Sequence, residues 1–194
     1  MSDGTTRDHI VEAADQLFYR RGYEHTSFSN IADAMRISRG NFYYHFKSKD
    51  DILDAVIGLR LDHSRRMLAR WDIEVKEPVD RIRNFIHILT VNRADIKRYG
   101  CPLGTLSEEL VKLNHVSQTE VNAQFTLYRT WLRRQFKLLG RKADADALTM
   151  HLLARRQGIA TLANIFHDEK FIRQEVKRMC DWLKSCADGA GPAD

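Results

Sequence analysis

Apolar side chains recur at helical spacing along most of the chain. In residues 10–18 they occupy positions i, i+3, i+4, i+7 and i+8, which form one face of an amphipathic helix. Further stripes of the same period run through residues 52–71, 82–96, 121–139, 144–166 and 170–187. Only three prolines and ten glycines occur among 194 residues, which argues against a β-rich fold with many turns. The pattern predicts an all-α protein.

Helix start signals divide the chain into segments. Thr5 and Asp8 have capping-box spacing in front of the first helix. Two short helices are predicted over about Ser29–Met35 and Arg39–His45, and a longer helix begins near Lys49. These elements predict a three-helix domain that a continuous helix joins to a larger helical bundle. The predicted boundaries are 1–47 for the first domain, 48–187 for the bundle and 188–194 for a disordered tail.

The stretch SRGNFYYHFKSK, residues 38–49, places five ring-bearing side chains in a row, and a helix can bury only some of them. Phe42 and Phe46, four positions apart, are the expected buried anchors, so the rings between them face outward. Two short helices of this spacing have helix-turn-helix proportions, in which the second helix enters the major groove of DNA. The alternative is an amphipathic helix whose rings form a core and whose charges are merely solvated.

Local charge and side-chain chemistry favour the DNA-binding interpretation. From Ala34 to Lys49 the chain carries four basic residues and no acidic one, although residues 1–50 as a whole hold seven of each. Asn41 and Arg39 can pair with base edges or phosphates, and Gly40 lets the backbone approach DNA closely. Tyrosine hydroxyls and Lys49 can contact phosphates.

The segments TSFSNIA (residues 26–32) and ISRGNFYYHFKSK (residues 37–49) resemble the DNA-binding domain of the tetracycline-repressor (TetR) family. The resemblance implies an all-helical homodimer that binds a palindromic operator with its N-terminal domain and a small molecule within its C-terminal bundle. Carried over by position, the residues expected to line the DNA are Ser27, Ser29, Ser38, Arg39, Gly40, Asn41, Tyr43, Tyr44, His45 and Lys49.

Arg36 departs from the family pattern, because the turn of the motif usually carries glycine at this position. A left-handed conformation there would cost a non-glycine residue on the order of 1 kcal/mol. Either the turn is reshaped, or Arg36 recovers the cost through a phosphate contact and also belongs to the DNA-binding set.

Aromatic residues recur in the larger domain, where a ligand pocket would need apolar walls and a few polar anchors such as Asn122 or Asn164. The predicted ligand-binding residues are Trp71, Phe85, His87, Cys101, Leu106, Phe125, Tyr128, Trp131 and Phe166. Ordinary core packing is the alternative for each aromatic residue.

The three cysteines include no CxxC pair, which fits reduced thiols and neither a disulfide framework nor a zinc site. Cys101 precedes Pro102 at the expected start of a helix, and helix N-termini lower the pKa of cysteine. Its segment resembles a cysteine-bearing stretch of TetR-family members that sense electrophiles, so Cys101 is a candidate sensor. A buried, inert cysteine is the alternative, and Cys180 and Cys186 are interpreted as structural.

Other functional classes find no support in the sequence. It contains no HExxH, P-loop, GxGxxG or GxSxG motif and no Glu-x-x-His pair, so we predict no enzymatic activity, no metal and no cofactor. The net charge of +5 fits an anionic partner. No apolar run reaches the roughly 18 residues of a membrane span, and we expect a cytoplasmic location.

The predicted function is a ligand-responsive repressor that binds a palindromic operator as a dimer and is released by a small-molecule effector, with electrophiles as one candidate class. The last two helices carry apolar stripes, and the resemblance implies that they form the dimer interface. The alternative is a constitutive DNA-binding dimer, or an activator, without a small-molecule ligand.

Overall fold

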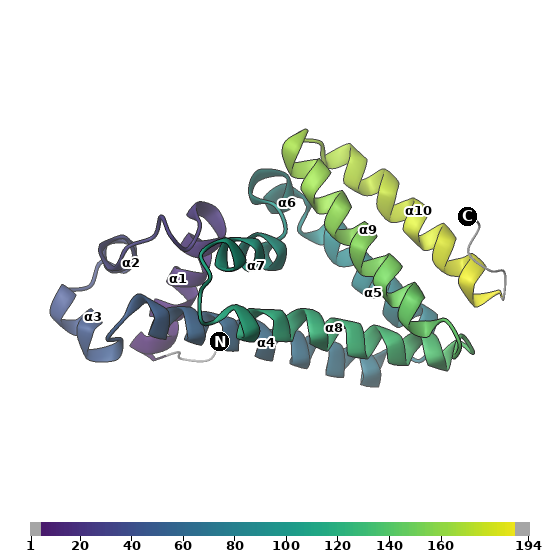
Figure 1. Ribbon diagram of the computed structural model, residues 1–194, viewed down its shortest axis with the longest axis horizontal. Helices are drawn as coiled ribbons and strands as arrows, with labels where there is room; N and C mark the ends of the chain where they lie inside the picture. Colours follow the sequence, from purple (N-terminus) through teal and green to yellow (C-terminus); the bar gives the residue numbers. More distant parts are fainter. Residues whose placement is uncertain (1–4, 189–194) are drawn as a thin grey trace. The chain divides into compact units, whose positions relative to one another are not determined.

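The computed structural model describes residues 5–188, except for the side chains of Arg39 and Asn41. All regular secondary structure in this part of the chain is helical, which confirms the predicted all-α fold (Figure 1). The helices are α1 (Thr6–Arg21), α2 (Phe28–Met35), α3 (Arg39–His45), α4 (Lys49–Glu74), α5 (Pro78–Val91), α6 (Arg93–Tyr99), α7 (Pro102–Lys112), α8 (Gln118–Leu138), α9 (Ala145–Ile165) and α10 (Glu169–Ala187). None of the helices in the described range is both long enough and apolar enough to cross a bilayer. Residues 189–194 of the predicted tail lie outside the described residues.

Reciprocal capping fixes the starts of α1 and α2. The Thr5 side chain accepts the N–H of Asp8, and the Asp8 carboxylate accepts the N–H of Thr5 at 2.9 Å, which confirms the predicted capping box. Ser27 and Asn30 form the same arrangement at the start of α2. Each cap satisfies backbone N–H groups that a helix leaves without an intrahelical acceptor.

The chain forms two compact units. The first unit comprises Met1–Ser64 and Pro102–Gln124, and the second comprises Arg65–Cys101 and Phe125–Asp194. The unbroken helix α4 contributes residues to both units, as does α8. The functional boundary predicted at residue 47 remains a prediction, because the units reflect packing and not function.

The core of the first unit joins α1, α2, α3 and the first turns of α4. Phe42 of α3 and Phe46, the residue directly after α3, are 1% and 2% exposed, which confirms the prediction that both rings are buried. Burying a phenylalanine contributes roughly 2–3 kcal/mol of transfer free energy, so these two rings hold a seven-residue helix that is too short to be stable by itself. The other buried residues of these helices include Ile10, Ala14, Phe18, Ile31, Ile52 and Leu53.

In the second unit, α10 packs against α5 and α9, which lie side by side with it in Figure 1. Their facing stripes are buried as the sequence predicts, and include Ile82, Phe85, Ile86, Leu89, Leu152, Ile172, Val176, Met179 and Leu183. The stripe predicted over 82–96 is not one helix. The chain leaves the α-helical conformation at Asn92 (φ −96°, ψ 13°), because asparagine favours helix ends, and Ile96 is buried from the separate helix α6.

Candidate nucleic-acid interface

The rings of α3 divide between the core and the surface. Tyr44 is 79% exposed and Tyr43 is 50% exposed, whereas Phe42 on the same helix is buried. His45 is half-buried, and its ring meets the Tyr44 ring edge-on at a centroid distance of 5.1 Å. Two large aromatic side chains therefore stand on the outside of a short helix, at a cost in apolar exposure that folding does not explain.

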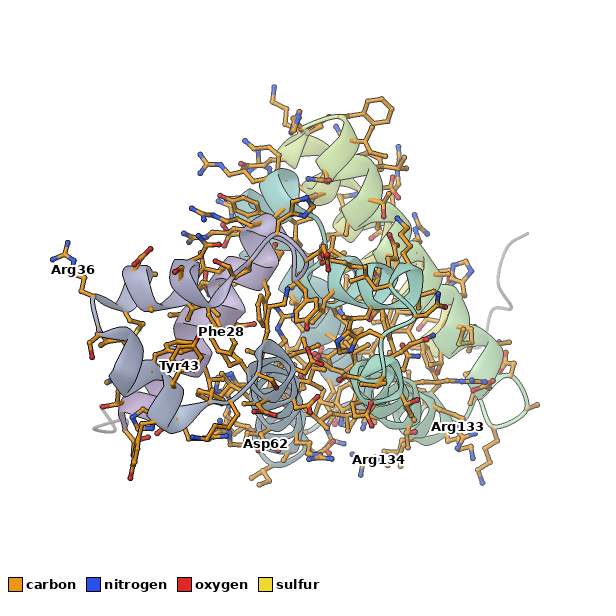
Figure 2. All side chains as sticks on the ribbon, turned by 60° about the vertical axis from the view of Figure 1, so that its left-hand side comes forward. Phe28, Arg36, Tyr43, Asp62, Arg133 and Arg134 are labelled. Carbon is orange, nitrogen blue, oxygen red and sulfur yellow. The ribbon has the colours of Figure 1, made fainter. Side chains whose placement is uncertain are left out.

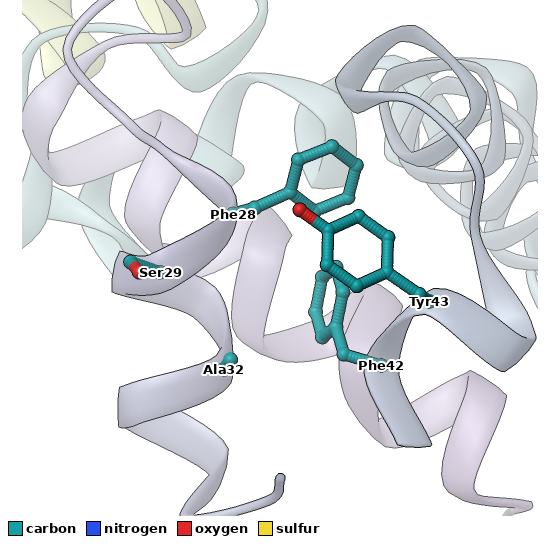
Figure 3. A pocket seen from close by; sticks show the side chains of 5 residues that line it. All are labelled: Phe28, Ser29, Ala32, Phe42 and Tyr43. Carbon is teal, nitrogen blue, oxygen red and sulfur yellow. The ribbon is translucent and has the colours of Figure 1, made fainter. Parts of the chain in front are cut away.

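A small pocket of about 50 Å³ lies between α2 and α3 (Figure 3). Its lining comes from Phe28, Ser29 and Ala32 of α2 and from Phe42 and Tyr43 of α3. The Phe28 ring lies 5.0 Å from the Phe42 ring and 5.4 Å from the Tyr43 ring, between centroids. This packing holds the exposed Tyr43 ring against α2.

The turn between α2 and α3 is closed by backbone hydrogen bonds around a left-handed residue. Arg36 has φ 55° and ψ 37°. Its N–H donates to the Asp33 carbonyl at 3.1 Å, and the Ile37 N–H donates to the Ala32 carbonyl at 3.2 Å, which is the Schellman pattern. The turn therefore keeps the geometry that usually takes glycine and is not reshaped. The Arg36 side chain extends away from the ribbon into open space (Figure 2).

Gly40 lies in the first turn of α3 with nothing within 4 Å of the place where a Cβ would stand. Neither packing nor backbone conformation within the unit therefore requires glycine here. The side chains of its neighbours Arg39 and Asn41, both predicted to contact DNA, lie outside the described residues.

The serines predicted at the interface occupy different positions. The Ser27 hydroxyl accepts the Asn30 N–H at 3.2 Å and so caps α2. Ser29 lines the pocket of Figure 3, and Ser38, directly before α3, is exposed.

Lys49 turns its ammonium group toward the protein. The Nζ atom donates to the Tyr23 carbonyl at 3.1 Å and lies 4.1 Å from the centroid of the Tyr23 ring. The start of α4 is capped by Asp51, whose carboxylate accepts the N–H groups of Lys47 and Ser48 at 3.1 and 3.0 Å. Hydrogen bonds from the Ser48 side chain and from these two N–H groups lower the pKa of Asp51. Lys49 is therefore placed to fix the α4 start, which the sequence did not predict.

Four of the predicted ligand-binding residues lie together in the second unit. The Phe85 ring lies 5.0 Å from the Tyr128 ring and 6.3 Å from the Trp131 ring, and Trp131 lies 6.0 Å from Trp71. The indole N–H of Trp131 donates to the Asp72 carboxylate at 3.2 Å. Arg156 is a further member of this cluster, which the sequence did not predict because no spacing pointed to it. Its guanidinium carbon lies 4.4 Å from the centroid of the Phe85 ring.

The other predicted ligand residues lie elsewhere. Phe166 follows α9 and is 72% exposed, so it is not a wall of the aromatic cluster, whereas Phe125 is half-buried. Leu106 is buried in the first unit, on α7, and Cys101 is half-buried directly before α7. His87 is exposed, with its Nε2 atom 3.9 Å from the sulfur of Cys180. Burial raises the pKa of the Cys180 thiol, and also that of Cys186, as expected for unreactive cysteines.

No cluster of His, Cys, Asp and Glu side chains suited to a metal ion occurs within the described residues.

Comparison with known proteins agrees with a helix-turn-helix formed by α2 and α3. Residues 10–56, which include α2 and α3, match the family described as bacterial regulatory proteins of the tetR family. A regulator of Lactococcus lactis subsp. lactis, described as an HTH-type transcriptional regulator in the lacX 3′ region, is 32% identical over 167 residues, covering 84% of this chain and 85% of the relative. The chain belongs to the TetR family of transcriptional regulators.

Further similarities extend beyond the N-terminal domain. The HTH-type transcriptional repressor DhaR of Mycobacterium sp. (strain GP1) is 28% identical over 134 residues, which cover 69% of this chain and 65% of DhaR. A solved structure of a TetR transcriptional regulator from Legionella pneumophila is 27% identical, has a TM-score of 0.81, and covers 93% of this chain and 98% of its own. The protein is therefore a helix-turn-helix DNA-binding regulator. Its relatives are transcriptional regulators, which are not a family of enzymes.

Proposed function

We propose that the protein is a ligand-responsive repressor that binds a palindromic operator as a homodimer and leaves it when a small molecule binds the C-terminal bundle. The observation that carries the DNA-binding part is the exposed face of α3, where Tyr43 and Tyr44 stand in a basic segment beside the open space at Gly40. The name of DhaR, which is a repressor, supports the sign of regulation. A DNA partner supports the proposed cytoplasmic location.

In this proposal α3 enters the major groove by its N-terminal end. Gly40 allows close approach of the backbone, and Tyr43 and Tyr44 contact sugars, phosphates or thymine methyl groups. Arg36 is exposed at the turn and can reach a phosphate. Lys49 contributes its backbone N–H at the start of α4, since its ammonium is held by Tyr23. The remaining proposed contacts are Ser27, Ser29, Ser38, Arg39, Asn41 and His45.

An exposed stripe on α9 supports a dimer through the last two helices. Met150, Leu162 and Ile165 are exposed, and they fall within about a third of the circumference of the helix. Gly158 lies on the same stripe with nothing within 4 Å of its Cβ position, so a second helix could approach closely. TetR-family regulators typically dimerise, which fits such a stripe.

The aromatic cluster around Phe85 is the proposed effector site, with Trp71, Tyr128, Trp131 and Arg156 beside it. His87, Cys101, Leu106, Phe125 and Phe166 stay proposals for that role without support from the cluster. An effector can release DNA only through a difference in its affinity for the two forms of the dimer.

Selection of duplexes from a random pool by the purified protein tests the proposed function. We expect an inverted repeat whose half-sites lie one helical turn apart (~34–36 Å) or somewhat more. Tyr44→Ala should weaken binding to the selected duplex at least about tenfold, while Ile73→Ala, a control at a site that is also exposed, leaves it unchanged. Failure to enrich any sequence, even at low salt, would refute the proposal.

A further inference from the structure

The loop between α1 and α2, residues 22–27, is held by a carboxylate from a distant part of the chain. Glu109 of α7 accepts the Tyr23 N–H on Oε2 at 2.9 Å and the Glu24 N–H on Oε1 at 2.9 Å. These partners are 86 and 85 residues away in sequence, yet all lie in the first unit, where α1 packs against α7. Both oxygens of one ionised group thus make charge-assisted bonds to consecutive backbone donors.

Gly22 shows how closely the loop and Glu109 fit. Its φ of 88° favours glycine, and its N–H donates to the Phe18 carbonyl at 3.0 Å to end α1. A Cβ at this position would stand 2.9 Å from Oε1 of Glu109, which is closer than real Cβ contacts come. The glycine therefore both ends the helix and leaves space for the carboxylate.

Tyr23 passes this restraint on to the start of α4. It is 3% exposed, its hydroxyl donates to the Asp50 carboxylate, and its carbonyl accepts the Lys49 ammonium. Burial is the largest cause that raises the pKa of Tyr23, and the hydrogen bond to Asp50 is the next. The phenol therefore keeps its proton and remains a donor.

His115, which follows α7, completes the network. Its Nδ1 accepts the Ser117 N–H at 3.1 Å, so Nε2 carries the hydrogen of the neutral ring. That nitrogen lies 3.3 Å from the Tyr23 hydroxyl oxygen and 3.5 Å from Oδ1 of Asp50. His115 therefore contacts the tyrosine whose backbone N–H Glu109 accepts, and it also contacts the Asp50 carboxylate to which that tyrosine donates.

These contacts fix the chain on both sides of the helix-turn-helix. Residues 23–24 precede α2 and are held by Glu109, whereas residues 49–50 follow α3 and are contacted by Tyr23, with His115 also near Asp50. Tyr23 therefore links the two points. We propose that Glu109 is a positioning residue for DNA binding, which holds α2 and α3 in the orientation that reads the operator. This inference rests on the proposed function and adds a residue outside the segment that matches the family.

A purely structural role for Glu109 makes a different prediction. A carboxylate that only stabilised the fold would change thermal unfolding and would affect operator and random DNA alike. A positioning residue affects mainly the operator, because base contacts demand orientation and phosphate contacts demand much less.

The test compares Glu109→Gln with Glu108→Gln, which removes the same charge from the adjacent, exposed position of α7. In Glu109→Gln the amide NH₂ group faces a backbone N–H, so one of the two bonds is lost. We expect the dissociation constant for the selected operator to rise at least about tenfold, as for loss of a charge-assisted bond, with less than about a threefold change on a random duplex. Glu108→Gln should change both by less than about twofold. Circular dichroism checks that the helices remain folded.

Tyr23→Phe keeps the inference testable if Glu109→Gln does not fold, because it removes one hydroxyl group from the network. Its operator affinity should fall at least about threefold. Unchanged operator affinity in the folded variants, or an equal loss on operator and random DNA, would overturn the positioning role alone. A wild-type protein that does not distinguish any operator from random DNA would refute the proposed function and the inference with it.

Discussion

Replacing Gly40 by alanine adds a single methyl group at the point where α3 is proposed to meet DNA. No atom lies within 4 Å of the position that the new Cβ would take, so the methyl group meets no steric conflict inside the protein. Alanine is favoured over glycine in helices by up to about 1 kcal/mol. The free energy of unfolding should therefore stay constant or rise by roughly 0.5–1 kcal/mol.

The same methyl group would stand between the helix backbone and the groove. A close backbone approach that is blocked should weaken operator binding at least about tenfold, which corresponds to about 1.4 kcal/mol. Thermal unfolding and fluorescence anisotropy with the selected operator measure the two effects separately. Stability and affinity should change in opposite directions, which is unusual for a mutation that merely disturbs a fold.

Gly58→Ala is the matched control. Gly58 lies within α4, is exposed, and also has nothing within 4 Å of its Cβ position. The control should show the same small gain in stability and unchanged DNA binding. If Gly40→Ala binds the operator as the wild type does, α3 does not approach DNA through this surface, and the reasoning is refuted.

Arg36→Gly should stabilise the protein by roughly 0.5 kcal/mol, because relief of the left-handed conformation exceeds the entropic cost of glycine. It should also lower the salt slope of DNA binding by about one. Urea unfolding measures the first effect and salt titration of DNA binding measures the second. Phe42→Ala should cost about 3–5 kcal/mol of unfolding free energy since the ring is buried, whereas Tyr44→Ala should cost less than about 0.5 kcal/mol, and denaturant titration of the pair would expose a wrong assignment of the two faces. Lys49→Ala should reduce affinity with a change in salt slope well below one, because its ammonium is bound to Tyr23; a drop of about one would place it on a phosphate instead. Gly158→Glu should leave the helical circular dichroism signal intact and produce monomers in analytical ultracentrifugation, and a persistent dimer would remove α9 from the interface.

Local patterns predicted the helix-turn-helix well. The bounds of α3 follow from Ser38 before it and from the spacing of Phe42 and Phe46, and each of these signals acts over four residues or fewer. The left-handed turn at Arg36 was recognised as a conflict between family pattern and residue type. Its outcome could not be decided from the sequence, because it depends on whether the Schellman bonds outweigh a steric cost of similar size.

Contacts between distant segments could not be predicted from the sequence. Nothing in the spacing of Glu109 links it to residue 23, and the direction of the Lys49 ammonium depends on where the Tyr23 carbonyl lies. Phe166 looks like a pocket residue by type, yet its place at the end of α9 leaves it exposed. Side-chain type constrains what a residue can do, whereas its partners are set by how the helices pack.

The aromatic cluster gives the protein an optical reporter of its own. The protein has three tryptophans. Trp71 and Trp131 lie in the cluster, with ring centroids 6.0 Å apart, whereas Trp182 of α10 stacks on His151 of α9. A compound that enters the cluster would alter the emission of the first two residues without any added dye. In a Trp182→Phe background the remaining signal would come from the cluster itself, so libraries of unlabelled compounds could be screened in plain buffer before any operator is known.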